Sequence, residues 1–199
     1  SFEIVGDAIK TLASFNYEAK SSYTVRVRST DAGGLSTEKA FTISVSDVNE
    51  APTALALSSS TVAENSAVGT VVGSFSTTDP DAGNTFTYTL VAGEGSTDNA
   101  SFQIVGNALK TAASFNYEAK SSYTVRVRST DQGGLTSDKV YTISITNVNE
   151  GATDVTVSAT AIAENLSAGT TVGTLATTDP DSSDTFTYTL ISGDGSADN

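Results

Sequence analysis

The sequence repeats itself with a period of 100 residues, and this period constrains the fold more than any other feature. Ser14–Thr30 returns unchanged as Ser114–Thr130, and the TTDPD segment that begins at Thr77 returns at Thr177. Aligned without gaps, 37 of 50 positions match in the first half-period and 25 of 49 in the second. A period of this length is the size of one β-sandwich domain, so the chain is expected to be part of a tandem array.

The domain boundary is expected at DVNEAP (47–52) and at its counterpart NVNEGA (147–152), because these segments follow strand-like runs. Residues 51–150 are then one complete repeat. Residues 1–50 are the C-terminal half of a preceding repeat, and residues 151–199 are the N-terminal half of a following one. Each half exposes strand edges and half a core, so either more of the same chain or another copy must complete it. We favour a longer continuous array, and in both cases Asn199 should lie near Ser1 of the next unit.

Short segments of alternating apolar and polar residues predict an all-β fold with no competing helical period. The complete repeat is expected to hold seven strands, at 54–63, 69–78, 85–91, 101–105, 108–113, 121–129 and 139–146. An odd number of up-and-down strands places the two termini at opposite poles, so successive sandwiches should stack end to end as a rod. The predicted core residues are Phe86, Tyr88, Leu90, Phe102, Ile104, Tyr123, Val125 and Val127.

Composition excludes several function classes. The chain has no Cys and no His, which removes thiolate nucleophiles, the usual catalytic triads and most transition-metal sites. Its net charge is −13 and its basic residues all lie in 1–50 and 101–150, so a nucleic-acid partner is not expected. No apolar run is long enough to span a membrane. The remaining Ser, Tyr and Lys residues show no nucleophile–base arrangement, so the chain is predicted not to be an enzyme.

Acidic and amide side chains gather at the predicted poles, where one repeat meets the next. Asp79 and Asp81 flank Pro80, which favours an extended backbone, so both carboxylates can point to one side. Ca²⁺ takes six to eight oxygen ligands in flexible geometry and therefore suits such a cluster. The predicted ligands at the first junction are Asn16, Glu18, Asp47, Asn49, Glu50, Asp79, Asp81 and Asp131. Those at the second are Glu64, Asn116, Glu118, Asn147, Asn149, Glu150, Asp179 and Asp181.

The motifs AEN, DPD, FNYEA, STDAGG and DVNEAP together resemble the calcium signature of cadherins. The resemblance covers essentially the whole chain and implies Greek-key, immunoglobulin-like sandwiches with Ca²⁺ between neighbouring domains. It also implies that Asp31 and Glu164, which repeat Asp131 and Glu64, are ligands. The abundance of Thr and Ser without Cys or Trp looks like the repeats of large bacterial surface adhesins.

The sequence departs from the cadherin pattern at several ligand positions. Asn16 and Asn116 stand where the family has Asp, and Glu50 replaces the second Asp of the linker. Asn147 replaces the first linker Asp at the second junction, which is therefore expected to bind fewer or weaker ions.

The leading functional hypothesis is an extracellular, calcium-stiffened stalk or adhesin. Its partners would be adjacent repeats, or identical copies joined head to tail, together with a cell-surface or matrix ligand. One alternative is a filament or sheath subunit whose half-domains are completed by neighbouring copies. The other is a glycan-binding module, which the inward positions of most aromatic residues disfavour.

Overall fold

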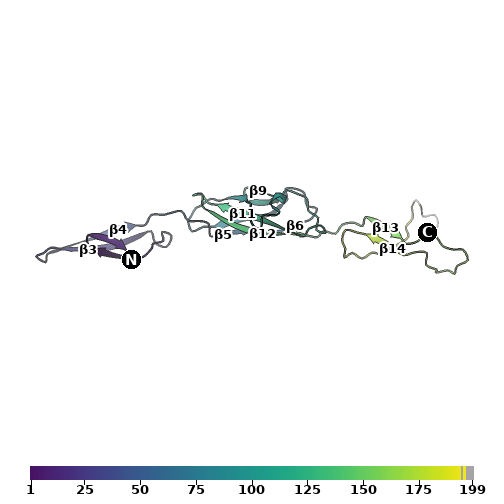
Figure 1. Cartoon of the computed structure of the whole chain (residues 1–199), viewed down its shortest axis with the longest axis horizontal. Coiled ribbons are helices and arrows are strands. Elements are labelled where there is room, and N and C mark those ends of the chain that lie inside the picture. Colours follow the sequence, from purple (N-terminus) through teal and green to yellow (C-terminus); the bar gives the residue numbers. More distant parts are fainter. Residues whose placement is uncertain (194, 196–199) are drawn as a thin grey trace.

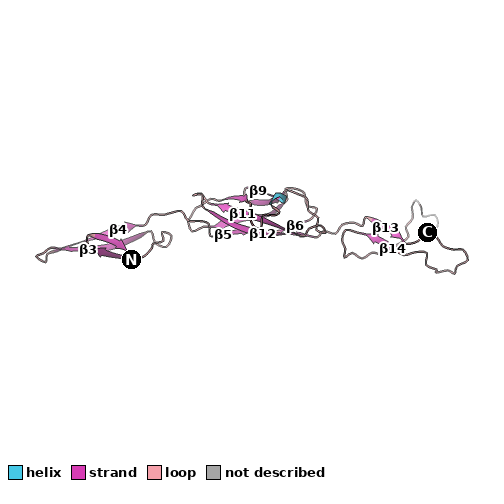
Figure 2. Ribbon diagram, viewed as in Figure 1, coloured by secondary structure: helices cyan, strands magenta, loops and turns pink. Residues whose placement is uncertain are grey.

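The computed structural model describes residues 1–193 and 195, and these form an elongated row of three bodies joined by two short linkers (Figure 1). Strands make up nearly all of the regular secondary structure, and the 3-10 helix η1 (Asn99–Ser101) is the one helical element among the described residues (Figure 2). No helix in this part of the chain is long and apolar enough to cross a membrane. The all-β prediction is thus confirmed. The predicted position of Asn199 lies outside the described residues.

The central body is a sandwich of two four-stranded sheets. One sheet has the order β5-β7-β10-β9 and consists of β5 (Ala54–Leu57), β7 (Val71–Thr78), β10 (Ala108–Thr111) and β9 (Phe102–Val105). The other has the order β6-β12-β11-β8 and consists of β6 (Thr61–Ala63), β12 (Thr136–Thr146), β11 (Ser122–Thr130) and β8 (Thr87–Leu90). The β9–β10 connection is a two-residue turn in which Gly106 has a φ of 63°.

The first predicted strand, 54–63, is in fact two strands that lie in different sheets. β5 pairs antiparallel with β7, whereas β6 pairs parallel with β12. Between them the chain crosses from one sheet to the other over Gly73. A Cβ at Gly73 would lie only 2.5 Å from the carbonyl oxygen of Ser59, so the crossing requires glycine there. The alternating pattern did not predict this change of sheet.

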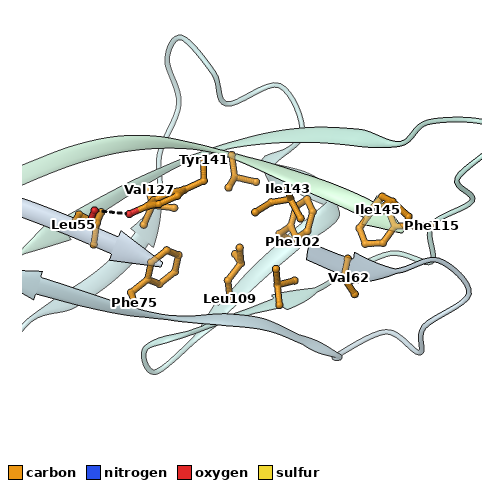
Figure 3. Packing of buried hydrophobic residues seen from close by; sticks show 12 residues of the cluster. Leu55, Val62, Phe75, Phe102, Leu109, Phe115, Val127, Tyr141, Ile143 and Ile145 are labelled. Carbon is orange, nitrogen blue, oxygen red and sulfur yellow. Dashed lines mark hydrogen bonds between the residues drawn. The ribbon is translucent and has the colours of Figure 1, made fainter. Parts of the chain in front are cut away.

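The core lies between the two sheets of the central body (Figure 3). Its buried apolar residues are Leu55, Val62, Val72, Phe75, Phe102, Leu109, Phe115, Val125, Val127, Tyr141, Ile143 and Ile145. The hydroxyl of Tyr141 donates a 2.8 Å hydrogen bond to the carbonyl oxygen of Leu55, which joins the two sheets inside this core (Figure 3). Each fully buried side chain such as Leu109 or Ile143 contributes roughly 2 kcal/mol through the area removed from water.

The core prediction was right for Phe102, Val125 and Val127, which are all buried. Four other predicted residues are only partly buried and pack against the edge of the core, namely Tyr88, Leu90, Ile104 and Tyr123. The prediction of Phe86 was wrong, because it precedes β8 and lies outside the core cluster. Phe75 of β7 and Tyr141 of β12 fill the space between the sheets instead.

The flanking bodies contain only two-stranded sheets. Residues 1–50 form β1 (Phe2–Val5) with β2 (Ala8–Thr11), and β3 (Ser22–Thr30) with β4 (Ser36–Ser44). Residues 151–193 form β13 (Asp154–Val157) paired with β14 (Leu175–Thr178). Many of their apolar side chains are exposed to solvent. Ile9 is 44% exposed, whereas Leu109, its counterpart in the central body, is fully buried.

Candidate metal centre

Acidic side chains from three separate segments meet at the linker before the central body. Glu18 comes from the loop before β3, Asp47 and Glu50 come from the linker, and Asp81 comes from the loop after β7. Each of these residues offers a carboxylate oxygen, and the four oxygens lie within 4.8 Å of one another. The structure thus brings the acids together across the boundary between two bodies.

Hydrogen bonds fix the loop after β7 and tie the linker to it. The carboxylate of Asp79 accepts at Oδ1 from the backbone N–H of Asp81 (3.0 Å) and from the side-chain amide of Asn84 (3.1 Å). Asp81 in turn accepts at Oδ2 from the backbone N–H of Glu50 (2.9 Å). This chain of bonds aligns Asp79, Asp81 and Glu50 on one side of the linker.

Asp131, in the loop between β11 and β12, holds the linker from the other side. It is 6% exposed, and its Oδ2 accepts a 3.0 Å hydrogen bond from the amide of Asn49. Burial raises the pKa of Asp131, but the Asn49 amide and the backbone N–H groups of its loop outweigh this and lower it. The neighbouring residue Gly133 makes room, since a Cβ there would lie 2.4 Å from Cγ of Asn49.

Glu64 is the most deeply placed acid of the second junction, with 2% of the residue exposed. Its two oxygens accept from the backbone N–H groups of Tyr117 (2.7 Å) and Val148 (2.8 Å), so it joins a loop of the central body to the next linker. Carboxylate oxygens of Glu64, Glu118 and Glu150 lie within 4.8 Å of one another.

The loop after β14 completes the second junction. Asp181 is 4% exposed and accepts at Oδ2 from the backbone N–H of Glu150 (2.7 Å), which repeats the Asp81–Glu50 bond of the first junction. Oxygens of Asp179, Asp181 and Asp184 also lie within 4.8 Å of one another. Asp184 was missed by the sequence analysis. The sequence could have indicated it, because Asp184 follows Asp181 by three residues, and the repeat alignment places it opposite Asn84 in the corresponding loop.

The crowding of these acids changes their proton affinities. Loss of hydration raises the pKa of Asp47, and the nearby charges of Asp81 and Glu18 raise it further. The pKa of Glu50 is also raised, by loss of hydration and then by Glu18. A hydrogen bond to its own backbone lowers the pKa of Glu118, but loss of hydration and neighbouring acids outweigh it, so the pKa is raised.

Four carboxylate oxygens at the two junctions are buried and have no hydrogen-bond partner. They are Oε2 of Glu50 and Oδ2 of Asp79 at the first junction, and Oε2 of Glu150 and Oδ1 of Asp181 at the second. A buried carboxylate oxygen without a donor is costly unless a cation is close. The donors are hard oxygens from flexible side chains, and this set fits Ca²⁺ better than zinc or other transition metals.

Several predicted ligands make other contacts. Asn16 and Asn116 each cap a turn, accepting from the backbone N–H of Ala19 (2.5 Å) and Ala119 (2.6 Å) respectively. The amide of Asn149 donates to the carbonyl oxygen of Glu150 (2.9 Å). The remaining three are exposed: Asn147 follows β12 at the second junction, whereas Asp31 and Glu164 lie in the outer bodies and belong to none of the acidic groups.

The central body is the part of the chain that matches a known protein family. Residues 58–146 match the model of the cadherin domain family. The central body is a cadherin-like domain. The acid groups described above therefore lie at the two ends of a cadherin-like domain, where it meets its neighbours.

Protocadherins are among the proteins that this chain resembles in sequence. Protocadherin gamma-B6 of Homo sapiens is 29% identical over 189 residues, covering 87% of this chain and 19% of the relative. Protocadherin Fat 4 of Homo sapiens is 30% identical over 197 residues, covering 95% of this chain and 4% of the relative. The chain thus spans about a fifth or less of the length of these relatives. Neither relative is bacterial, so the bacterial source stays a prediction.

Solved structures of tandem cadherin domains have the same fold. Extracellular cadherin domains 1–4 of protocadherin gamma B7 superpose with a TM-score of 0.67 at 22% identity, covering 92% of this chain and 47% of theirs. A cis-dimer structure of domains 3–6 of protocadherin gamma B7 gives a TM-score of 0.60 at 26% identity, covering 90% and 45%. The chain therefore has the fold of stacked cadherin-like β-sandwiches.

Proposed function

We propose that this chain is a segment of an extracellular adhesive array in which Ca²⁺ at each junction holds neighbouring cadherin-like repeats in line. The observation that carries this proposal is the pair of buried, unpartnered carboxylate oxygens at each junction. The family match and the protocadherin relatives support the same role, because cadherin domains are modules of adhesion rather than catalysis.

The charge balance of the junctions supports a cation in particular. Ion pairs among the described residues engage Glu38, Asp98 and Asp138, and all three acids lie away from the junction groups. The junction acids therefore face one another with no Lys or Arg in ion-pair distance. A divalent cation would relieve this repulsion and supply the contact that the buried oxygens lack.

The positions of the junction acids support a particular set of proposed calcium ligands. At the first junction they are Glu18, Asp47, Glu50, Asp79, Asp81 and, through its position beside Asn49, Asp131. At the second they are Glu64, Glu118, Glu150, Asp179, Asp181 and Asp184. Each set links a loop of one repeat, the linker and a loop of the next repeat, so a bound ion would resist bending at the linker.

Titration calorimetry of chelator-treated protein with CaCl₂ tests the proposal. Extracellular calcium modules bind with dissociation constants of about 10⁻⁴–10⁻³ M, so millimolar Ca²⁺ should saturate the parent chain. The double variant Asp79→Ala, Asp81→Ala should lose the heat of the first junction and keep that of the second.

A matched control removes two acids that lie outside both junctions, with the substitutions Glu3→Ala and Glu94→Ala. This variant has the same net charge as the first and should titrate like the parent. If both double variants bind Ca²⁺ as the parent does, the site assignment is wrong.

A filament or sheath subunit remains the second candidate, because one observation favours it. The two outer bodies expose apolar faces that the central body buries. No contact or recess in the described part of the chain points in the same way to a glycan.

A further inference from the structure

Three hydroxyl groups meet inside the central body, at the end nearest the first junction. The hydroxyl oxygens of Thr77 on β7 and Ser129 on β11 lie 2.8 Å apart, and the Thr77 hydroxyl donates to that of Tyr88 on β8 (3.2 Å). Because a hydroxyl carries one proton, Ser129 is then the donor in the 2.8 Å bond. These three residues are termed the hydroxyl bridge.

The hydroxyl bridge crosses from one sheet to the other. β7 belongs to the first sheet, whereas β8 and β11 are neighbours in the second, where Ser129 lies opposite Tyr88. Packed sheets stand about 10 Å apart, so side chains as short as Thr and Ser can meet only where the sandwich narrows. Ser129 is fully buried there, and its hydroxyl needs the acceptor that Thr77 provides.

Both long strands of the bridge lead directly into loops of the first junction. β7 and β11 each end one residue beyond the bridge, so Asp79 and Asp131 are the first residues after these strands. Side chains two residues apart in an extended chain point to the same side. The two acids therefore follow Thr77 and Ser129 toward the linker, one from each sheet.

The two loops hold different residues of the linker. Asp131 accepts from the amide of Asn49 (3.0 Å), whereas Asp81, next to Pro80 in the other loop, accepts from the N–H of Glu50 (2.9 Å). The linker thus lies between two loops that belong to opposite sheets. Its acids can keep a constant arrangement only if the distance between those loops is constant.

We propose that the hydroxyl bridge is a positioning element of the first junction. It fixes the separation between the loops of Asp79 and Asp131, and it thereby raises the Ca²⁺ affinity of this junction. Groups that are already ordered lose less conformational entropy when they bind, and residues behind a metal site commonly hold its ligands in this way. The calcium part of this inference rests on the function proposed above.

A related contact occurs beside the second copy of the acidic loop. The hydroxyl oxygens of Thr177 and Tyr188 lie 2.9 Å apart, as those of Thr77 and Tyr88 lie 3.2 Å apart. Thr177 precedes Asp179 by two residues, as Thr77 precedes Asp79. The Thr–Tyr contact therefore accompanies the Asp-Pro-Asp loop at both of its positions in the chain.

The competing explanation is that the hydroxyl bridge only stabilises the sandwich. Removal of the Thr77 hydroxyl would leave that of Ser129 buried without an acceptor, which lowers the stability of any domain. A stabilising contact alone predicts easier unfolding in urea and an unchanged Ca²⁺ affinity, because affinity is measured on the folded chain. A positioning element predicts that the affinity falls as well.

Calorimetric titration of the 199-residue chain with CaCl₂ separates these explanations. The background carries Asp179→Ala and Asp181→Ala, which leaves the first junction to bind the ion. Thr77→Val should weaken its Ca²⁺ affinity by about fivefold, the equivalent of one hydrogen bond. Thr77→Ser keeps the hydroxyl and should retain the affinity of the parent.

Thr111→Val is the matched control for the loss of a buried hydroxyl. Thr111 is also fully buried, and its hydroxyl donates to the carbonyl oxygen of Ala67 (3.1 Å). Its backbone N–H donates to Thr70, just before β7 begins, so it lies at the end of β7 opposite to Thr77. This variant should unfold more easily in urea and keep the Ca²⁺ affinity of the first junction.

The double variant Thr77→Val, Ser129→Ala removes both hydroxyls of the 2.8 Å bond, so neither is left buried without a partner. Replacing both partners of a hydrogen bond by apolar groups costs less than replacing one. Urea unfolding in chelator should show part of the stability regained relative to Thr77→Val alone. The Ca²⁺ affinity should stay low. Recovery of both would reduce the bridge to a stabilising contact and overturn the proposal.

Amide hydrogen exchange in chelator measures the ordering of the two loops without any metal. The N–H of Asp81 donates to Asp79 (3.0 Å), and the N–H of Leu135 donates to Asp131 (2.8 Å). Both N–H groups should exchange faster in Thr77→Val than in the parent, because the loops that hold them separate more often.

The far end of the same domain provides an internal control for exchange. The N–H groups of Tyr117 and Val148 donate to Glu64 at 2.7 and 2.8 Å, and their exchange should not change in Thr77→Val. Faster exchange at both ends would indicate general destabilisation and would count against positioning.

The hydroxyl bridge and the calcium function fail in distinguishable ways. A parent chain that takes up no Ca²⁺ excludes the calcium function, and equal exchange rates in parent and Thr77→Val would then exclude the bridge as well. If the parent takes up Ca²⁺ and Thr77→Val binds it with the same affinity, the calcium function stands and the bridge is not a positioning element.

Discussion

At the scale of single residues, the repeat alignment shows one charge exchanged between the two junctions. Asn147 stands where the first linker has Asp47, and Asp184 stands where the first loop has Asn84. Asn84 donates to Asp79, whereas Asp184 can only add a third carboxylate beside Asp179. The acid lost from the linker is thus offset by one gained in the loop. The expected weakness of the second junction stays a prediction.

Exchanging the two loop residues should exchange calcium affinity between the junctions. Asp184→Asn should weaken the second junction by about threefold to tenfold, because ligand charge tunes calcium affinity. Asn84→Asp should strengthen the first junction, since it replaces a hydrogen-bond donor by an anion. Calorimetric titration of both variants checks this, and the double exchange serves as control with an unchanged net charge. An Asp184→Asn variant that binds as tightly as the parent would show that Asp184 is not a ligand.

At the scale of elements, ion pairs between Asp138 and two arginines link the long strands β11 and β12. Asp138 of β12 accepts from Nε of Arg128 (2.7 Å) and from Nη2 of Arg126 (3.0 Å), which both lie on β11. The Arg128 hydrogen bond, aided by Arg126 and opposed by partial burial, lowers the pKa of Asp138 to about 2. Glu38 makes the same contacts with Arg26 and Arg28 on the β3–β4 pair.

Asp138→Asn should destabilise the central domain at neutral pH and lose this effect in acid. The carboxylate of Asp138 is ionised below its ordinary pKa of 3.8 only in the folded state, so its contribution is complete above pH 3.8 and disappears as the pH falls through about 2. The partly exposed arginines limit the effect to about 1 kcal/mol. Urea unfolding of parent and variant at pH 7 and at pH 2.5 measures the difference, which should shrink at the lower pH. A pH-independent difference would assign the effect to packing.

At the scale of the whole molecule, the acids sit at the linkers and the core sits between the sheets. The core cluster of the central body consists of apolar residues and includes none of the junction acids, whereas each linker is bordered by like charges. Calcium should therefore control the angle between repeats more than the folding of the central domain.

Small-angle scattering should show a straight rod in CaCl₂ and a shorter mean extension in chelator. Near-ultraviolet circular dichroism of the same samples follows the packing of the buried aromatic rings and should change little. Loss of that signal on chelation, or identical scattering in both buffers, would contradict this division of roles.

The fold class and the acid positions could be predicted from the sequence, because both depend on local patterns. Alternation along strands such as 122–130 shows which side chains face inward, and the 100-residue period shows which segments share a place in the repeat. The core was predicted less well. Phe86 has the same alternation as Tyr88, but of the two only Tyr88 packs against the core, and β8 begins after Phe86, at Thr87.

The sequence alone determined that the chain is all-β, that its repeat is 100 residues long and that acids recur at fixed places in each repeat. Only the tertiary structure decided that strand 54–63 divides between two sheets, that Asp184 joins Asp179 and Asp181, and that particular oxygens of Glu50 and Asp79 are buried without partners. The physical reason is distance along the chain. Alternation and turn chemistry act between neighbouring residues, whereas burial and charge crowding arise between segments that meet only after the sheets have packed.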